Sequence, residues 1–115
     1  MHTQFEIRPL QVGDLGAVVD IDARIAGRRR TAFFEKRLEA ALAEPSYFIY
    51  IACEQDGVLL GYLQARLLEG EYGSTEKAAS LDNIGVKPGS NGQGIGKALM
   101  AEFEAILKHK GVRVI

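Results

Sequence analysis

A glycine-rich stretch places four glycines within eight residues, between a proline and a hydrophobic segment: Gly89-Ser90-Asn91-Gly92-Gln93-Gly94-Ile95-Gly96. Glycine has no Cβ, so this density lets the backbone adopt positive φ and come close to a ligand. The segment that follows carries apolar residues at three- and four-residue spacing, which predicts an amphipathic helix. A helix N-terminus has free N–H groups and the positive end of the helix dipole. The stretch therefore predicts an anion site, most often one for a phosphate.

Two common phosphate loops do not match this stretch. A P-loop requires Ser or Thr after its Gly-Lys pair, but Gly96-Lys97 is followed by Ala98. The dinucleotide fingerprint Gly-x-Gly-x-x-Gly fails at its third glycine, where Lys97 stands. A tight turn without a ligand is the remaining structural alternative, although a bare turn seldom needs this many glycines.

The run IGVKPGSNGQGIGKAL resembles motif A of the GNAT superfamily, the acyl-CoA-dependent N-acyltransferases. The family motif is a hydrophobic strand, a proline-containing turn and a Gln/Arg-x-x-Gly-x-Gly/Ala segment that opens a helix. One departure is that Asn91 stands where the family usually has Gln or Arg. The resemblance implies acetyl-CoA as co-substrate, with its diphosphate on the turn and its pantetheine arm along the strand. The cofactor-binding residues implied in this way are Ile84, Gly85, Val86, Asn91, Gly92, Gln93, Gly94, Gly96 and Lys97.

Direct acetyl transfer to an amine, without a covalent enzyme intermediate, is the activity that the resemblance implies. An alkylammonium must lose a proton before it attacks, so a base is required. Asp82 is the candidate base, because several family members place a carboxylate at this position, and Asn83 is a candidate substrate contact. A solvated or turn-side residue without a catalytic role is the alternative for Asp82. We expect the period-two alternation of a strand to put Asp82, Ile84 and Val86 on one face. The family's usual acid, a tyrosine on a later helix, has no matching position in this chain.

The composition is that of one ordinary domain of 115 residues, with a formal net charge of −1, 47% hydrophobic and 25% charged residues. This charge does not favour nucleic-acid binding. The single cysteine, Cys53, excludes an internal disulfide, and we expect it to be buried packing rather than a nucleophile. No apolar run is long enough to span a membrane and no signal peptide is recognised, which predicts a cytoplasmic protein. We expect no metal ion.

The hydrophobic pattern predicts alternating strands and helices along the whole chain. Asp14 is the predicted cap of a first helix whose buried face carries Leu15, Val18, Val19 and Ile25. Asp56-Gly57 is a strong signal for a hairpin turn. The predicted elements are strand 5–10, helix 14–26, helix 31–44 (with Phe34, Leu38, Ala41 and Leu42 on its buried face), strands 47–54, 58–68 and 81–86, helix 95–110 and a strand from 111, with a loop at 70–77.

This order gives an α/β fold with a mixed, mostly antiparallel sheet and helices on both sides, and it matches the GNAT fold up to its fifth strand. The resemblance then implies an incomplete GNAT domain over residues 1–115, without the last helix and closing strands. An exposed strand edge there favours pairing with a second copy, so we expect a homo-oligomer. A CoA-binding or assembly module without turnover is the alternative function. Arg28-Arg29-Arg30 is either a solvated loop or a substrate or phosphate contact.

Overall fold

The computed structural model describes residues 5–69, 77–90 and 94–114. A 3-10 helix, η1, spans Val12–Asp14 between the first strand and the first helix. The strands and helices are β1 (Glu6–Pro9), α1 (Leu15–Ala26), α2 (Thr31–Ala43), β2 (Phe48–Gln55), β3 (Val58–Glu69), β4 (Lys77–Val86), α3 (Ile95–Lys110) and β5 (Arg113–Val114). Their order confirms the predicted one.

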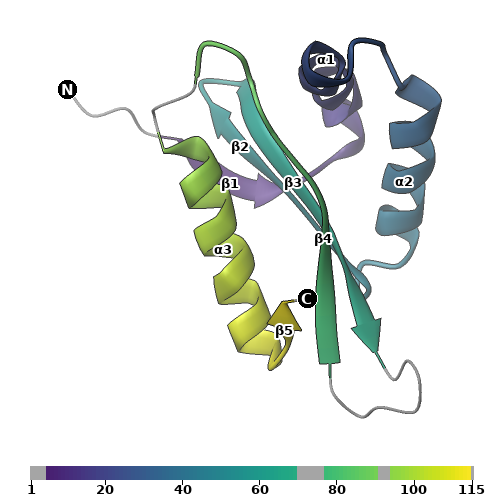
Figure 1. Cartoon of the computed structure of the whole chain (residues 1–115), viewed down its shortest axis with the longest axis vertical. Helices are drawn as coiled ribbons and strands as arrows, with labels where there is room; N and C mark the ends of the chain where they lie inside the picture. The colour runs from purple at the N-terminus through teal and green to yellow at the C-terminus, as the bar shows by residue number, and fades with distance from the viewer. Residues whose placement is uncertain (1–4, 70–76, 91–93, 115) are drawn as a thin grey trace.

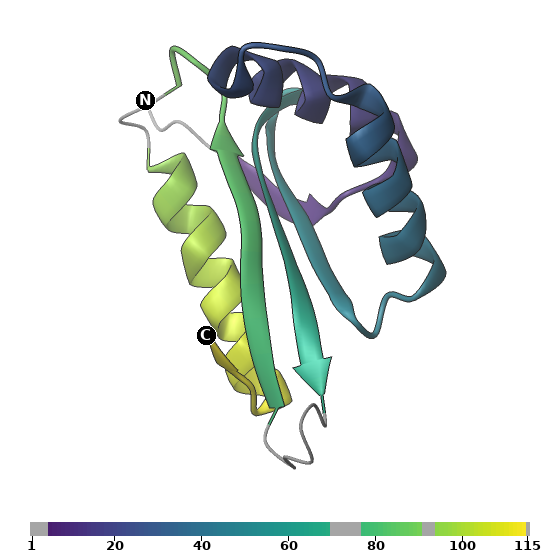
Figure 2. The same cartoon turned by 45° about the vertical axis from the view of Figure 1, so that its right-hand side comes forward.

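The strands form one sheet in the order β1-β2-β3-β4-β5. The first four are antiparallel neighbours, and β5 runs parallel to β4 through the pairs Ala78↔Arg113 and Ala79↔Val114. Helix α3 covers one face of this sheet, while α1 and α2 cover the other (Figures 1 and 2). The fold is therefore the predicted α/β class with a mostly antiparallel sheet.

The β2–β3 hairpin turns at the predicted dipeptide. Asp56 and Gly57 have φ of 52° and 80°, both in the left-handed region. Two positive φ values in a two-residue loop are typical of a type I′ turn, whose twist matches that of the paired strands. A bulge between Cys53 and Glu54 then shifts the register by one residue, and beyond it Tyr50 lies opposite Gln64.

Helix α1 ends as predicted but begins differently. Gly27, with φ of 82°, ends it in the left-handed conformation typical of a helix C-terminus. Asp14 occupies the predicted N-cap position, but its side chain makes no capping hydrogen bond to the helix. Its carboxylate instead accepts two hydrogen bonds from Arg8, both 2.8 Å long, and one from the Gln11 amide. Ile25 was placed wrongly on the buried face, since it is 68% exposed.

Helix α2 packs with a narrower apolar face than predicted. Phe34, Leu38 and Ala41 are buried, as expected from their spacing. Leu42 is 47% exposed, because it lies one position beyond the last buried residue of the helix and turns toward solvent.

Each face of the sheet has its own hydrophobic cluster. Leu63, Leu99 and Phe103 are fully enclosed under α3, while Phe34 and Tyr62 are enclosed under α1 and α2. Cys53 belongs to the cluster under α3, and burial raises the pKa of its thiol. The thiol is thus packing, as predicted from its position in a strand.

Candidate functional site

The end of β4 and the start of α3 lie against each other. Val86 and Ile95 belong to the same hydrophobic cluster, which holds the strand end beside the first turn of the helix. The first hydrogen bond of α3 runs from the Ala98 N–H to the Gly94 carbonyl at 2.9 Å. The amides of the preceding helical residues therefore have no acceptor within the helix, which is the arrangement that binds anions. The predicted ligands Asn91, Gly92 and Gln93 lie outside the described residues.

The glycines at this helix start face open space. Gly94 adopts φ of 77°, a conformation that residues with a side chain rarely adopt. A Cβ on Gly94 would meet nothing within 4 Å, and one on Gly96 would meet only Val86 Cγ2, at 3.8 Å. Packing within the described chain thus does not explain the glycine at position 96. Lys97, on the same turn, is exposed.

The last residues of β4 present an open edge. In the described part of the chain, β5 pairs with β4 only at Ala78 and Ala79, so the segment from Ile84 to Val86 has no partner strand on that side. Gly85 is needed for packing on the α1–α2 face: a Cβ there would lie 2.6 Å from Tyr62 Cε1. The strand end can therefore pair its backbone with an extended ligand while Tyr62 supports it from one face.

A β-bulge in β4 changes the direction of the predicted base. Gln64 pairs with Asn83 and Ala65 pairs with Leu81, which leaves Asp82 as the extra residue. Asp82 consequently lines a pocket on the α2 side with Asn83, whereas Ile84 packs in the cluster under α3. The prediction that Asp82, Ile84 and Val86 share one face was wrong, because the bulge interrupts the period-two alternation.

The pocket that contains Asp82 and Asn83 is polar and has a volume of about 360 Å³. Its other lining residues come from α2 with the residue before it, and from β2 and β3: Arg30, Phe33, Arg37, Tyr50, Gln64 and Arg66. Sequence reasoning missed most of these residues. Tyr50 and Gln64 align with Asn83 across three strands. The register of the turn alone would pair Tyr50 with Leu63, because a bulge between Cys53 and Glu54 shifts the pairing by one residue, so no local signal could have found this alignment. We call this cavity the polar pocket.

Side-chain hydrogen bonds hold Asp82 and Asn83 in place, one of them from the Ser80 hydroxyl to Asp82 at 3.4 Å. Asp82 forms an ion pair with Arg66, with 3.1 Å between the Nε and a carboxylate oxygen. The Asn83 side-chain amide donates to the Tyr62 hydroxyl at 3.1 Å. Burial raises the pKa of Tyr62 to about 12, so its phenol stays protonated at neutral pH. Asn83 thus has one of its donors engaged inside the protein.

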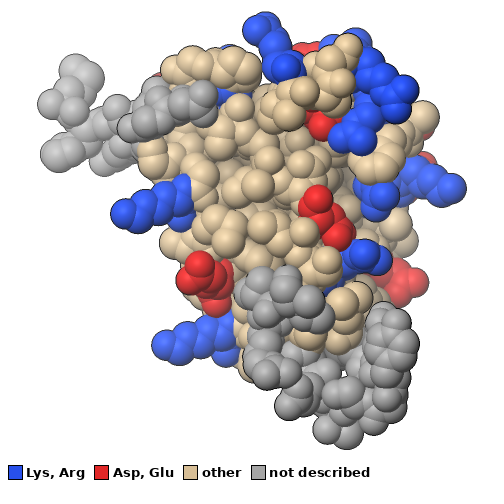
Figure 3. Space-filling view, viewed as in Figure 1, with Lys and Arg blue, Asp and Glu red and all other residues tan. Residues whose placement is uncertain are grey.

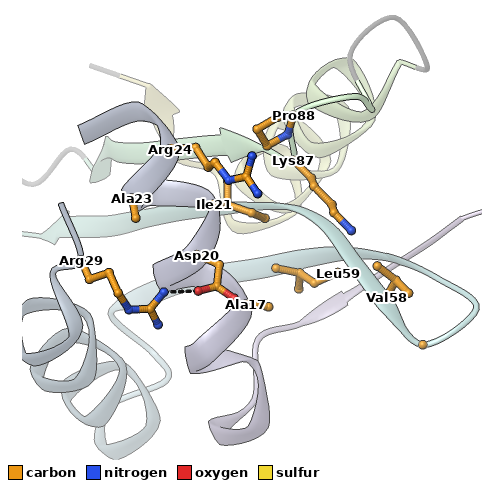
Figure 4. Close-up of a pocket in the computed structure, with 11 residues that line it drawn as sticks. Ala17, Asp20, Ile21, Ala23, Arg24, Arg29, Val58, Leu59, Lys87 and Pro88 are labelled. Carbon is orange, nitrogen blue, oxygen red and sulfur yellow. Dashed lines mark hydrogen bonds and ion pairs between the residues drawn. The ribbon is translucent and has the colours of Figure 1, made fainter. Parts of the chain in front are cut away.

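A larger pocket, about 710 Å³, lies between α1, the β2–β3 hairpin and the chain that leaves β4 (Figure 4). It is lined by Arg24, Arg29 and Lys87 together with one carboxylate, Asp20. Lys and Arg side chains also gather over the end of the molecule where α1 and α2 meet (Figure 3). This pocket borders the segment that leads into the glycine-rich turn.

The three consecutive arginines diverge toward different partners. Arg29 pairs with Asp20 beside the larger pocket. Arg30 forms two parallel hydrogen bonds to Asp22, of 2.8 and 2.7 Å, and lines the polar pocket. Arg28 is exposed. The arginine run is thus partly a set of internal ion pairs, and two of its members border the two pockets.

Across residues 5–69, 77–90 and 94–114, no cluster of three or more His, Cys, Asp or Glu side chains is arranged to hold a metal ion. None of the helices in these ranges has the length and apolar character needed to cross a bilayer.

A domain with this sheet, this open strand edge and this glycine-capped helix is of the acetyltransferase class. The model of the acetyltransferase (GNAT) family matches residues 16–115. The chain belongs to this family.

Two relatives and one solved structure agree with that assignment. An aminoglycoside N(6')-acetyltransferase type 1 from Stenotrophomonas maltophilia is 30% identical over 80 residues, 68% of this chain and 52% of the relative. A putative [ribosomal protein bS18]-alanine N-acetyltransferase from Bacillus subtilis is 26% identical over 115 residues, 98% of this chain and 68% of the relative. This chain thus spans about half the length of the aminoglycoside relative.

The solved structure is a GNAT family acetyltransferase from Brucella melitensis in complex with acetyl-CoA. It superposes with a TM-score of 0.69 at 24% identity, covering 96% of this chain and 72% of that one. At this identity the likeness shows the GNAT fold.

Proposed function

We propose that this domain is an N-acetyltransferase that transfers the acetyl group of acetyl-CoA to an amine acceptor. The observation that carries the proposal is the continuity of three features: the open edge of β4, the left-handed Gly94 and the α3 N-terminus with space above Gly96. An extended ligand ending in a diphosphate fits such a surface, because strand edges pair with extended chains and helix N-termini bind phosphates.

In this proposal the backbone of Ile84, Gly85 and Val86 binds the pantetheine arm. The diphosphate lies on the turn and first helical residues, with Asn91, Gly92, Gln93, Gly94, Gly96 and Lys97 as its ligands. Lys97 is exposed beside the helix start, where its positive charge favours a diphosphate. Membership of the family and the acetyl-CoA complex of a structural neighbour support this choice of co-substrate.

The acceptor lies in the polar pocket, where Asp82 accepts the proton that the ammonium loses. Acetyl-CoA supplies the acetyl group as a thioester, and the nitrogen–carbon bond that forms replaces the carbon–sulfur bond that breaks. The CoA thiolate leaves and takes up a proton. Arg66, whose Nε lies 3.1 Å from a carboxylate oxygen of Asp82, holds that carboxylate at the pocket. Asn83 contacts the acceptor from the adjacent position on the strand.

Calorimetric titration with acetyl-CoA tests the co-substrate site. Gly96→Ala places a methyl group where the diphosphate would lie, so we expect binding to weaken at least about fivefold, the effect of an overpacked contact. Stability should not fall, because the added Cβ meets only Val86 at an ordinary contact distance. Gly16→Ala is the matched control: Gly16 is also the second residue of its helix, and a Cβ there meets nothing within 4 Å.

Equal acetyl-CoA affinity in wild type and Gly96→Ala would contradict the proposed site. Release of free thiol with a panel of amines then tests turnover. Binding without thiol release would select a CoA-binding module that does not catalyse the reaction. A homo-oligomer and a cytoplasmic location stay predictions, and light scattering tests the first of them.

A further inference from the structure

The polar pocket carries more positive than negative charge. Three guanidinium groups line it, from Arg30, Arg37 and Arg66, against one carboxylate, Asp82. Asp22 lies behind the pocket and compensates Arg30 through two short hydrogen bonds. Arg66 is compensated by Asp82. Arg37 makes no ion pair within the described residues, so one positive charge remains over the pocket.

Arg37 is held at the pocket by an aromatic ring rather than by a carboxylate. Its guanidinium carbon lies 4.1 Å from the centre of the Phe33 ring, and that of Arg30 lies 4.5 Å from the same centre. Two like charges on one ring repel each other, and an anion bound near them would reduce that repulsion. Phe33 is 39% exposed, so the ring and both cations are open to a ligand.

The two ion pairs of the pocket differ in strength. Arg30 and Asp22 form a fork of two parallel hydrogen bonds, and the Asp22 side chain is only 7% exposed. Arg66 contacts Asp82 through its Nε alone, at 3.1 Å, and its side chain is 53% exposed. An exposed pair of this kind contributes little to stability, so its two partners can separate at low cost. The Arg30–Asp22 pair therefore stays intact when a ligand binds. Arg66 can leave Asp82 and bind a ligand carboxylate instead.

These contacts identify the kind of amine that the pocket fits. We propose that the acceptor carries a carboxylate near its amine, so that the ammonium binds Asp82 and the carboxylate binds Arg66 and Arg37. The proposal rests on the acetyltransferase function and specifies its substrate class. Guanidinium groups bind carboxylates with two parallel hydrogen bonds, which makes them selective for this partner. A polycation such as an aminoglycoside would instead be repelled by the uncompensated charge of Arg37.

Matched acceptor pairs test this specificity in the full chain. Initial rates of thiol release are compared for alanine against alaninamide, and for a peptide beginning Ala-Glu against one beginning Ala-Gln. We expect kcat/KM to be roughly tenfold to a hundredfold higher for the acidic member, the range for hydrogen bonds to charged groups. The free amino acids and the peptides distinguish a small acceptor from a protein N-terminus.

Arg37→Gln and Arg66→Gln should each remove most of this preference. Lys36→Gln is the control: it removes the same charge from an exposed position of α2 that does not line the polar pocket. Equal rates within each acceptor pair would overturn the proposal, and so would a preference that survives both arginine substitutions.

Titration of the same acceptors by NMR, without acetyl-CoA, separates this inference from the proposed function. If acetyl-CoA does not bind, the acetyltransferase function fails, and the acceptor role proposed for the pocket fails with it. If acetyl-CoA binds but the acidic members show no tighter binding and no faster turnover, only the specificity for a carboxylate is overturned.

Discussion

The two faces of the sheet are built from different chemistry. Under α3 the buried residues are apolar, with Leu63, Leu99 and Phe103 fully enclosed. Under α1 and α2 the apolar cluster is interrupted by buried polar groups, and Asp14, Asp22 and Gln64 are each less than 10% exposed. Burial of polar groups costs free energy unless they are paired, and here ion pairs with Arg8 and Arg30 provide the partners for the two carboxylates.

We expect the apolar face to contribute mainly to stability and the polar face mainly to the chemistry of the site. The apolar face needs only shape and hydrophobic burial, while the polar face holds ion pairs next to a pocket open to solvent. Strand β4 belongs to both faces, because its bulge directs Asp82 into the polar pocket and leaves Ile84 in the apolar cluster. Four substitutions test whether the two faces act independently.

Phe103→Ala should give the largest effect. Phe103 is fully buried under α3, and replacing such a residue with alanine leaves a cavity that typically costs about 3–5 kcal/mol. Urea unfolding measures the loss, and Phe103→Leu serves as the milder variant if Phe103→Ala does not fold. The acceptor preference per folded molecule should be unchanged. A changed preference would show that the two faces are coupled.

Asp82→Asn should lower turnover and leave stability unchanged, the opposite of what we expect for Phe103→Ala. Loss of a general base typically lowers turnover by a factor of about a hundred or more. The free energy of unfolding and the acetyl-CoA affinity should remain near those of wild type, since the contacts of Asp82 with Arg66 and with the Ser80 hydroxyl are exposed. Steady-state rates and calorimetry measure these quantities. Asp56→Asn, in the exposed β2–β3 turn, is the control for the same change of charge, and unaltered turnover in Asp82→Asn would remove Asp82 from the mechanism.

Gly85→Ala should disturb both the packing against Tyr62 on the α1–α2 face and the open edge of β4. The new Cβ would lie 2.6 Å from the Tyr62 ring, which is fully buried and cannot move aside. Overpacking of this kind costs about 1–3 kcal/mol. We expect a lower melting temperature together with weaker acetyl-CoA binding, because the edge of β4 must shift. A double-mutant cycle with Tyr62→Leu measures the clash, and additive effects would show that there is none.

Asp14→Asn should make the polar face less sensitive to acid. Hydrogen bonds from Arg8 hold the pKa of the Asp14 carboxyl below its usual range. A lowered folded-state pKa contributes stability that is present above the unfolded pKa, about 4, and is lost as the pH falls through the folded value. The variant should be less stable at neutral pH by about 1–2 kcal/mol. Denaturation at pH 7 and pH 3 should show this difference shrinking at the lower pH, and a constant difference would contradict the assignment.

Local patterns predicted the parts of this molecule that local chemistry determines. Helix α3 has the bounds that its apolar spacing and Gly111 indicate, and the β2–β3 turn lies at Asp56-Gly57. The bulge at Asp82 was not predicted, because it depends on how β4 pairs with β3 rather than on the residues of β4 themselves. In a strand with a bulge, the alternation of residues does not by itself show toward which face of the sheet a side chain points.

The polar pocket was missed for a related reason. Its arginines come from positions 30, 37 and 66: the packing of α2 over the sheet brings Arg30 and Arg37 to the pocket, and the pairing of β3 with β4 brings Arg66 beside Asp82. The run Arg28-Arg29-Arg30 drew attention by its charge, yet Arg37 and Arg66, isolated in the sequence, complete the site. The lining of the polar pocket therefore depends on contacts between segments that are distant in the chain.

The lone thiol of Cys53 gives the molecule an intrinsic reporter. Its side chain has no exposed surface, so a thiol-reactive reagent can reach it only when β2 separates from its neighbours. The alkylation rate at reagent excess then measures how often that opening occurs, without any introduced label. A ligand that binds only the closed sheet would slow the reaction, in proportion to its concentration over its dissociation constant.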